Sequence, residues 1–135
     1  YHNACLYPDM ASCFIMIDKA NKENGCLKVL KGSHRVGRIS HERSDTPEQT
    51  ADNERIRELE KRHESIYIEA EPGDALFFHA NLLHSSDANK SQNSRRTLIV
   101  CFNTKSNNPY KEIGHASYNQ LKVANHNSIM EYKID

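Results

Sequence analysis

The sequence has 135 residues, the size of a single domain. Eighteen basic residues balance 18 acidic ones, so the formal net charge is zero, and no basic stripe points to a nucleic-acid or membrane-surface partner. The longest apolar runs, such as CFIMI, are far shorter than the roughly 20 residues that span a bilayer, and we expect neither a membrane segment nor a secretory signal.

The four cysteines, Cys5, Cys13, Cys26 and Cys101, show no Cys-x-x-Cys pairing. Three of them lie in apolar, strand-like runs, which favours buried free thiols over disulfides or a zinc site. Free thiols are typical of a reducing compartment, and we therefore expect a cytoplasmic protein.

Two strands are expected near the N-terminus. Residues 11–18 (ASCFIMID) form an apolar run, and residues 26–34 (CLKVLKGSH) alternate with the period of a half-buried strand. Asn24-Gly25 lies between them and readily takes positive φ. The pattern predicts that these two runs form an antiparallel pair.

A helix is expected over residues 46–62 (TPEQTADNERIRELEKR). Thr46 is a suitable N-cap, Pro47 suits the first helical position, and Gln49 completes a capping-box spacing. The apolar stripe is sparse, which is typical of a solvated helix. We interpret it as an inserted surface helix near residues 47–62.

Short strands are expected over the rest of the chain. They cover residues 65–70, 75–80, 82–86 and 95–103, and Pro72-Gly73 fits a type II turn whose backbone the Asp74 side chain would bind. From residue 104 the pattern is loop-like, with a short helix near 118–123. Many short strands with turns between them predict an all-β sandwich or barrel.

One polar set stands out among these strands. In NLLHSS the alternation places His84 and Ser86 on the same face. Arg95 follows His84 by eleven residues and opens the next strand. If the two strands pair antiparallel, that face also carries Arg95, Thr97, Ile99 and Cys101. Neutral imidazole suits Fe, Zn, Cu or Ni, and a guanidinium matches a carboxylate. A small dicarboxylate that chelates a metal at one end and meets Arg95 at the other would therefore fit this set as a ligand.

Two segments, NGCLKVLKGSHRVGRI and EPGDALFFHANLLHSSDANKSQNSRRTLIVCFN, resemble the phytanoyl-CoA dioxygenase family over roughly residues 3–103. The resemblance implies an iron(II)- and 2-oxoglutarate-dependent oxygenase on a double-stranded β-helix (a jelly-roll, cupin-like fold). It also implies a small-molecule substrate and molecular oxygen. For the site residues, it implies that His84 is the distal iron ligand and that Arg95 binds the far carboxylate of 2-oxoglutarate. Ser86 would help to bind the same carboxylate, and Arg96 would be a surface residue.

The chain departs from the family pattern at the metal site. The family takes its other two ligands from a His-x-Asp motif, and none of the eight histidines here is followed two residues later by Asp or Glu. Because the chain begins with Tyr1 in mid-pattern, we expect it to be the C-terminal portion of such an oxygenase, inactive alone if the motif is missing. The expected domain is then 1–135, with a core over 3–103 and a loop-rich tail over 104–135.

Other interpretations stay open at this point. The chain could be a non-catalytic β-sandwich of the same ancestry that binds a small molecule or a partner, and a family member that lacks the motif's carboxylate would halogenate rather than hydroxylate. A cupin-like metal protein of another activity is disfavoured because it has no general need for the Arg95 anion clamp.

The remaining candidates have weaker support. Beyond the metal ligand no catalytic residue is assigned: Ser33-His34 lacks the context of a nucleophile, and His79 is expected to be a packed strand histidine. His34 and Arg35 are expected near the mouth of the site, and Tyr1, Tyr7 and Asp9 are candidates to line the co-substrate pocket.

Overall fold

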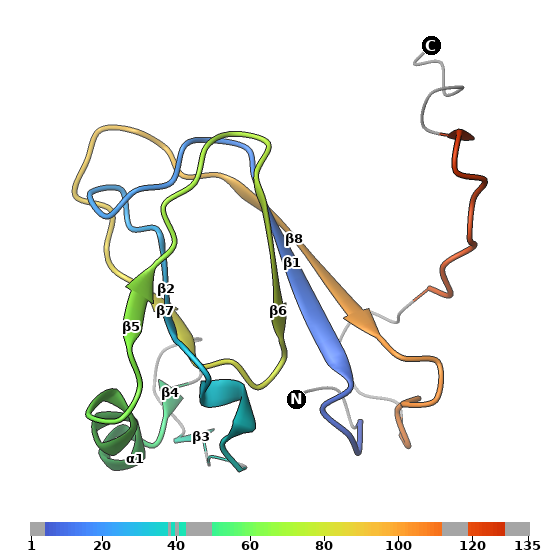
Figure 1. Ribbon diagram of the computed structural model, residues 1–135, viewed down its shortest axis with the longest axis horizontal. Helices are drawn as coiled ribbons and strands as arrows, with labels where there is room; N and C mark the ends of the chain where they lie inside the picture. Colours follow the sequence, from blue (N-terminus) through green and yellow to red (C-terminus); the bar gives the residue numbers. More distant parts are fainter. Residues whose placement is uncertain (1–4, 38, 40, 43–49, 112–118, 129–135) are drawn as a thin grey trace.

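The computed structural model describes residues 5–37, 39, 41–42, 50–111 and 119–128 (Figure 1). Within these ranges the chain forms short strands, one α-helix and one turn of 3-10 helix. In chain order they are β1 (Met10–Met16), β2 (Leu27–Leu30), η1 (Ser33–Arg35), β3 (His41–Glu42), β4 (Thr50–Ala51), α1 (Asn53–Glu60), β5 (Ser65–Tyr67), β6 (Ala75–His79), β7 (His84–Ser86) and β8 (Thr97–Asn103).

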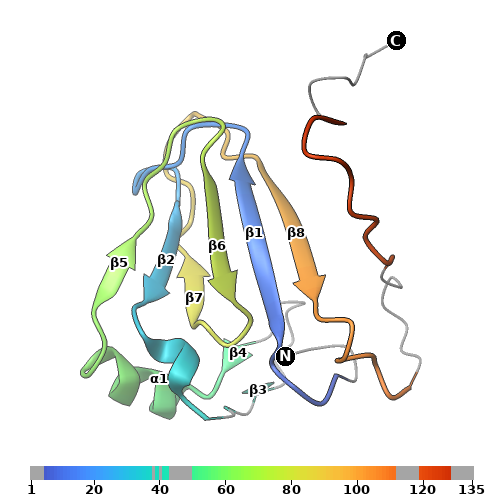
Figure 2. The same ribbon diagram turned by 45° about the vertical axis from the view of Figure 1, so that its right-hand side comes forward.

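Two antiparallel sheets form the body of the protein. One has the strand order β6-β1-β8 and the other β5-β2-β7. Figure 1 views them as two facing layers, and Figure 2 shows β8 and β7 each at one end of its sheet. The sandwich predicted from the many short strands is confirmed, and each predicted strand lies within one or a few residues of an observed one.

The core between the layers follows from strand alternation. Leu27 and Val29 of β2 and Phe78 of β6 are buried against each other. Phe14 of β1 packs on this cluster, and its register partners are Leu76 and Ile99. Because side chains directly opposite each other in a ladder share one face, the even-numbered residues of β1 and the odd-numbered residues of β8 face the interior.

The predicted pairing of residues 11–18 with 26–34 is wrong. Both edges of β1 are already occupied, by β6 and β8, so β2 joins the other layer. The connection is held by the buried Asn24 side chain, which accepts from the Asn21 N–H and donates to the Lys19 carbonyl. Gly25, at φ +79°, completes the turn. Asn24-Gly25 therefore carries the chain between layers instead of closing a hairpin.

The predicted pairing of the His84 and Arg95 strands is also wrong. β7 pairs with β2, and β8 pairs with β1. The polar loop between them crosses from one layer to the other, because each strand finds an apolar partner earlier in the chain. Its end is fixed by Arg96, whose Nε and Nη2 donate to the two carboxylate oxygens of Asp18 at 2.9 and 2.8 Å.

The helix is shorter than predicted. α1 begins at Asn53 because Asp52 caps it: the Asp52 carboxylate accepts from the Arg55 N–H at 3.0 Å. The expected start at 46 is wrong, since Thr50–Ala51 is a strand; Thr46, Pro47 and Gln49 lie outside the described residues. None of the α1 side chains is buried, which confirms a solvated surface helix.

No helix in the part of the chain that the structure describes is long and apolar enough to cross a membrane. The short helix expected near 118–123 does not form over residues 119–123, which are irregular; Tyr118 lies outside the described residues. The described tail segment runs apart from both sheets, beyond β8 (Figures 1 and 2).

The Pro72-Gly73 turn is confirmed. Gly73 has φ +94°, the Asp74 N–H donates to the Glu71 carbonyl, and the Asp74 carboxylate accepts from the Glu71 N–H at 2.8 Å. The Asp74 side chain therefore stabilises the turn, as predicted.

None of the four cysteines, all of which lie in the described ranges, forms a disulfide. Cys13 and Cys26 are buried as expected and Cys5 is buried as well, but the expected burial of Cys101 is wrong, since it is exposed. Its register partner on β1 is Ser12, and Cys101 is exposed because β8 ends its sheet and no described strand covers its free edge.

Candidate functional site

His84 and Ser86 point into the space between the two layers. Their partners in β2 are Val29 and Leu27, both members of the buried core, so all four side chains lie on the inner face. The predicted sharing of one face by His84 and Ser86 is confirmed. The His84 ring lies 5.1 Å from the Phe78 ring across the interior, measured between centroids.

The two nitrogens of His84 have different roles. Nδ1 lies 2.8 Å from the Leu82 carbonyl oxygen, which can only accept, so Nδ1 carries the proton. In the neutral ring Nε2 then keeps its lone pair. Metal-binding histidines typically have this arrangement, in which the other ring N–H donates to a carbonyl or carboxylate.

The interior is open to solvent beside β7 and β8. His84 and Ser86 are exposed although they lie on the inner face. Ile99, which shares the inner face with Phe14, is 54% exposed. Each of these exposed residues lies on a strand that ends its sheet (Figure 2). The His84 imidazole is therefore accessible to solvent.

The two adjacent arginines have different surroundings. Arg96 is 70% exposed and binds Asp18 through two N–H groups on one edge of its guanidinium, which lowers the pKa of the Asp18 carboxyl from 3.8 to about 2. Arg95 is half-buried, and no carboxylate among the described residues forms an ion pair with it. The expectation that Arg96 is a surface residue is confirmed.

The charge of Arg95 acts on the buried Cys26 thiol, directly before β2. Burial raises the pKa of the Cys26 thiol, Glu69 adds to the rise, and the positive charge of Arg95 opposes it. Cys26 directly precedes Leu27, the β2 partner of Ser86. Arg95 thus contributes to the positive charge around the Cys26 thiol, together with Lys22.

The described residues do not supply a complete metal site. Among them, no group of three His, Cys, Asp or Glu side chains could hold a metal ion. His84 is thus one suitable ligand without two partners in the described ranges. Tyr7 and Asp9 are exposed, and Tyr1 lies outside the described residues; their role at a co-substrate pocket stays a prediction.

His79 has a structural environment. Its Nδ1 accepts from the Asn81 N–H at 3.0 Å, and its ring centroid lies 5.9 Å from that of His34. It alternates with Phe78, so it points away from the core. The ring contact with His34 fits the expected packed strand histidine.

The aromatic neighbours of the His84 imidazole come from two strands of the other layer. Phe14 and Phe78 lie 5.0 Å apart, measured between ring centroids, and each makes a ring contact with His84. Which inward-facing residues meet depends on how the two layers are placed.

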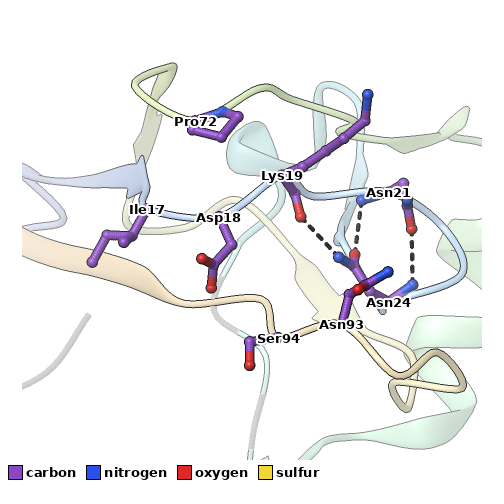
Figure 3. A pocket seen from close by; sticks show the side chains of 8 residues that line it. All are labelled: Ile17, Asp18, Lys19, Asn21, Asn24, Pro72, Asn93 and Ser94. Carbon is purple, nitrogen blue, oxygen red and sulfur yellow. Dashed lines mark hydrogen bonds between the residues drawn. The ribbon is translucent and has the colours of Figure 1, made fainter.

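A separate surface pocket of about 330 Å³ lies where the loop after β1 meets the loop before β8 (Figure 3). Asp18, Asn24 and Ser94 are among its lining residues, whereas His84, Ser86 and Arg95 are not. Two of its polar lining residues, Asn21 and Asn24, form hydrogen bonds with each other that hold the loop. This pocket is therefore not part of the candidate site.

Comparison with known proteins gives consistent results. The chain is 33% identical over 89 residues to the 2-aminoethylphosphonate dioxygenase of Uncultured bacterium HF130_AEPn_1, covering 66% of this chain and 31% of that protein. It is 30% identical over 113 residues to the ectoine dioxygenase of Sphingopyxis alaskensis, covering 76% of this chain and 37% of that protein. The chain therefore spans about a third of the length of these curated relatives.

Solved structures show the same fold. EctD from S. alaskensis with 2-oxoglutarate and 5-hydroxyectoine superposes with a TM-score of 0.69 at 24% identity, covering 84% of this chain and 38% of that one. EctD with bound Fe superposes with a TM-score of 0.63 at 28% identity, covering 76% and 34%. The mainly-β fold is thus the double-stranded β-helix of these oxygenases, which confirms the expected fold class.

The sequence profile of phytanoyl-CoA dioxygenase (PhyH) matches residues 1–97, most of the chain and the whole of both sheets up to the first residue of β8. This chain belongs to the phytanoyl-CoA dioxygenase family.

Proposed function

We propose that this chain is the part of an iron(II)- and 2-oxoglutarate-dependent dioxygenase, a hydroxylase of the phytanoyl-CoA dioxygenase type, that supplies one metal ligand and the co-substrate anchor. The metal ligand is His84 through Nε2. The anchor for the far carboxylate of 2-oxoglutarate is Arg95, with the Ser86 hydroxyl assisting. Molecular oxygen and a small molecule are the other substrates.

The observation that carries this proposal is that His84 and Arg95 each leave a group available for a ligand. His84 has Nδ1 committed to a carbonyl and Nε2 available. Arg95 is half-buried without an ion pair to any described carboxylate. Burial of a cation without a counter-charge is costly, and a dicarboxylate would relieve that cost through a bidentate pair.

The residues of this chain would bind and orient the reactants. Iron, when bound, supplies the activation of oxygen that is coupled to the oxidation of 2-oxoglutarate. Phe78 and Phe14 limit the rotation of the His84 ring, and the planar fork of Arg95 sets the direction from which the co-substrate enters. Because the described residues hold no three-ligand group, the complete reaction requires ligands outside the described ranges.

The substrate class is not part of the proposal. Relatives carry names as different as 2-aminoethylphosphonate dioxygenase, methylphosphonate hydroxylase and ectoine dioxygenase. One scaffold thus serves several substrates, and the site decides among them. A cytoplasmic location likewise stays a prediction, based on the free thiols.

The lack of a three-ligand group among the described residues favours one alternative function. A non-catalytic member of the same fold would bind a small carboxylate or another partner at Arg95 without iron. It would retain the anion anchor and need no further metal ligands. The two functions differ in whether a metal strengthens the binding of 2-oxoglutarate.

Thermal unfolding without oxygen tests the proposal. The protein is heated alone, with iron(II), with 2-oxoglutarate, and with both. A ligand that binds only the folded state at 100 times its Kd stabilises it by about 2.7 kcal/mol. We expect both together to raise Tm more than either alone. The Arg95→Ala variant should lose the part that depends on 2-oxoglutarate, and His84→Ala the part that depends on iron.

Two matched controls separate the site from general destabilisation. Arg96→Ala removes a neighbouring guanidinium that is already paired with Asp18, and should keep the response to 2-oxoglutarate. His126→Ala removes an exposed histidine in the described tail segment, and should keep the response to iron. A response to 2-oxoglutarate that iron does not enhance would favour the binding module, and no response at all would contradict both functions.

A further inference from the structure

The Gly-Ser-His segment at residues 32–34 has no part in the proposed chemistry, yet it contains a fully buried polar side chain. Gly32 has φ +83° and starts the single turn of η1. Ser33 follows it with no exposed surface. A buried hydroxyl is costly unless it forms hydrogen bonds, so the partner of Ser33 is informative.

That partner is the backbone just before β7. The Leu83 N–H donates to Ser33 Oγ at 2.9 Å. The Leu83 carbonyl in turn accepts from the Leu30 N–H at 3.0 Å. The backbone at Leu83 is thus held on both sides, although β7 proper begins only at His84.

The Leu83 N–H and the Leu82 carbonyl belong to one peptide group. Ser33 Oγ accepts from its N–H end, and its C=O end accepts the Nδ1 proton of His84 at 2.8 Å. The peptide group is planar and trans, so the direction of its N–H fixes the direction of its C=O. The serine hydroxyl and the imidazole therefore bind opposite ends of one rigid unit, and hydrogen bonds in such a chain polarise one another.

We infer that Ser33 is a positioning residue for His84. Its hydroxyl holds the Leu82–Leu83 peptide group so that the Leu82 carbonyl faces the imidazole, which keeps the proton on Nδ1 and the lone pair on Nε2. Without the hydroxyl this peptide group can rotate, and the His84 ring loses the acceptor that selects its tautomer. The biological meaning of the inference rests on the proposed role of His84, but its test needs no metal.

Imidazole ¹H–¹⁵N correlation spectra measure the tautomer directly. Spectra are recorded on metal-free protein at a pH of about 8.5, above the usual imidazole pKa of about 6.5. A His84→Asn variant identifies the signals of His84. In the wild type we expect the pattern of a single tautomer protonated on Nδ1.

Three substitutions at Ser33 and one control test the hydrogen bond. Ser33→Ala removes the acceptor, and Ser33→Cys nearly keeps the shape with a much weaker acceptor. Both should lose the single-tautomer pattern, and Ser33→Thr, which keeps a hydroxyl, should retain it. Cys13→Ala, a buried change in the other layer, should destabilise the fold and keep the pattern.

The inference is overturned if Ser33→Ala and Ser33→Cys keep the wild-type pattern, or if Cys13→Ala loses it equally. If neither Ser33 variant folds, the wild type decides: a Leu83 amide proton that exchanges as fast as one in an open loop would overturn the inference. The result is independent of the thermal test, because the spectra of a protein that binds neither iron nor 2-oxoglutarate would still show whether Ser33 selects the His84 tautomer.

Discussion

Replacing Gly25 with alanine places a methyl group where the backbone of Asp87 already lies. An ideal Cβ on Gly25 would be 2.4 Å from the Asp87 carbonyl oxygen and 3.4 Å from the backbone of Ala88 and Asn89. Carbon and oxygen that are not bonded do not approach so closely, and the obstacle is main chain that cannot rotate away. The 87–89 segment directly follows β7, so the substitution would displace the end of the strand that carries His84 and Ser86.

The expected cost has two parts. Gly25 has φ +79°, and a residue with a Cβ loses about 1–2 kcal/mol in the left-handed region. Forcing an extra methyl into occupied space typically adds about 1–3 kcal/mol. We therefore expect Gly25→Ala to lower the free energy of unfolding by about 2–5 kcal/mol, a large share of the roughly 5–15 kcal/mol of a typical domain.

Two other glycines isolate the steric part. Gly73 has φ +94°, and nothing lies within 4 Å of the position that an added Cβ would take, so Gly73→Ala should cost only the backbone part of about 1–2 kcal/mol. Gly37 has neither positive φ nor a close neighbour, and Gly37→Ala should be neutral or slightly stabilising, by at most about 1 kcal/mol. Of these three glycines, Gly25 alone combines strain with a backbone clash.

Urea unfolding followed by circular dichroism measures all three variants. We expect the midpoints to fall in the order Gly37→Ala, Gly73→Ala, Gly25→Ala, with similar slopes. Equal midpoints for Gly25→Ala and Gly73→Ala would refute the clash and, with it, the close contact between the β1–β2 connection and the end of β7.

Two further predictions concern Asp18 and Phe78. Because Arg96 lowers the pKa of Asp18 to about 2, the stabilisation from this pair should be fully present above about pH 4 and lost as the pH falls through about 2. Asp18→Asn should remove this stabilisation, so the urea midpoints of wild type and variant should converge in acid. A difference between the midpoints that persists at pH 2 would contradict the assignment. Phe78→Ala should lower the free energy of unfolding by about 3–5 kcal/mol and disturb the His84 ring signals. The matched control Phe77→Ala, at a residue 67% exposed on the opposite face, should change it by about 0.5 kcal/mol or less. Similar losses of stability in both variants would show that Phe78 is not a core residue.

Much of the local structure could be read from the sequence. Alternation placed the strands, and it put His84 and Ser86 on one face because consecutive strand residues point to opposite sides. The Pro72-Gly73 turn and the binding of its backbone by Asp74 followed from the φ preferences of those residue types. The helix start did not follow, because two acceptable caps, Thr46 and Asp52, lie six residues apart and β4 decides between them.

The pairing of strands could not be read in the same way. Alternation fixes which face of a strand is apolar but not which strand lies beside it, since backbone N–H and C=O groups are the same in every strand. The sequence predicted a hairpin of residues 11–18 and 26–34, but β6 and β8 occupy both edges of β1. His84 and Arg95 likewise looked like neighbours on paired strands, whereas β7 and β8 belong to opposite layers.

By itself, then, the sequence determined most of the strands, the shared face of His84 and Ser86 and the family to which the chain belongs, because these depend on residue type and short-range spacing. The tertiary structure alone decided which polar groups are occupied. Arg96 is paired because Asp18, 78 residues away, lies within 2.8 Å of it, whereas no described carboxylate forms an ion pair with Arg95. It also brought Ser33 to the peptide group that holds the His84 imidazole, since that contact joins residues 50 apart in the chain and exists only once the two layers have formed.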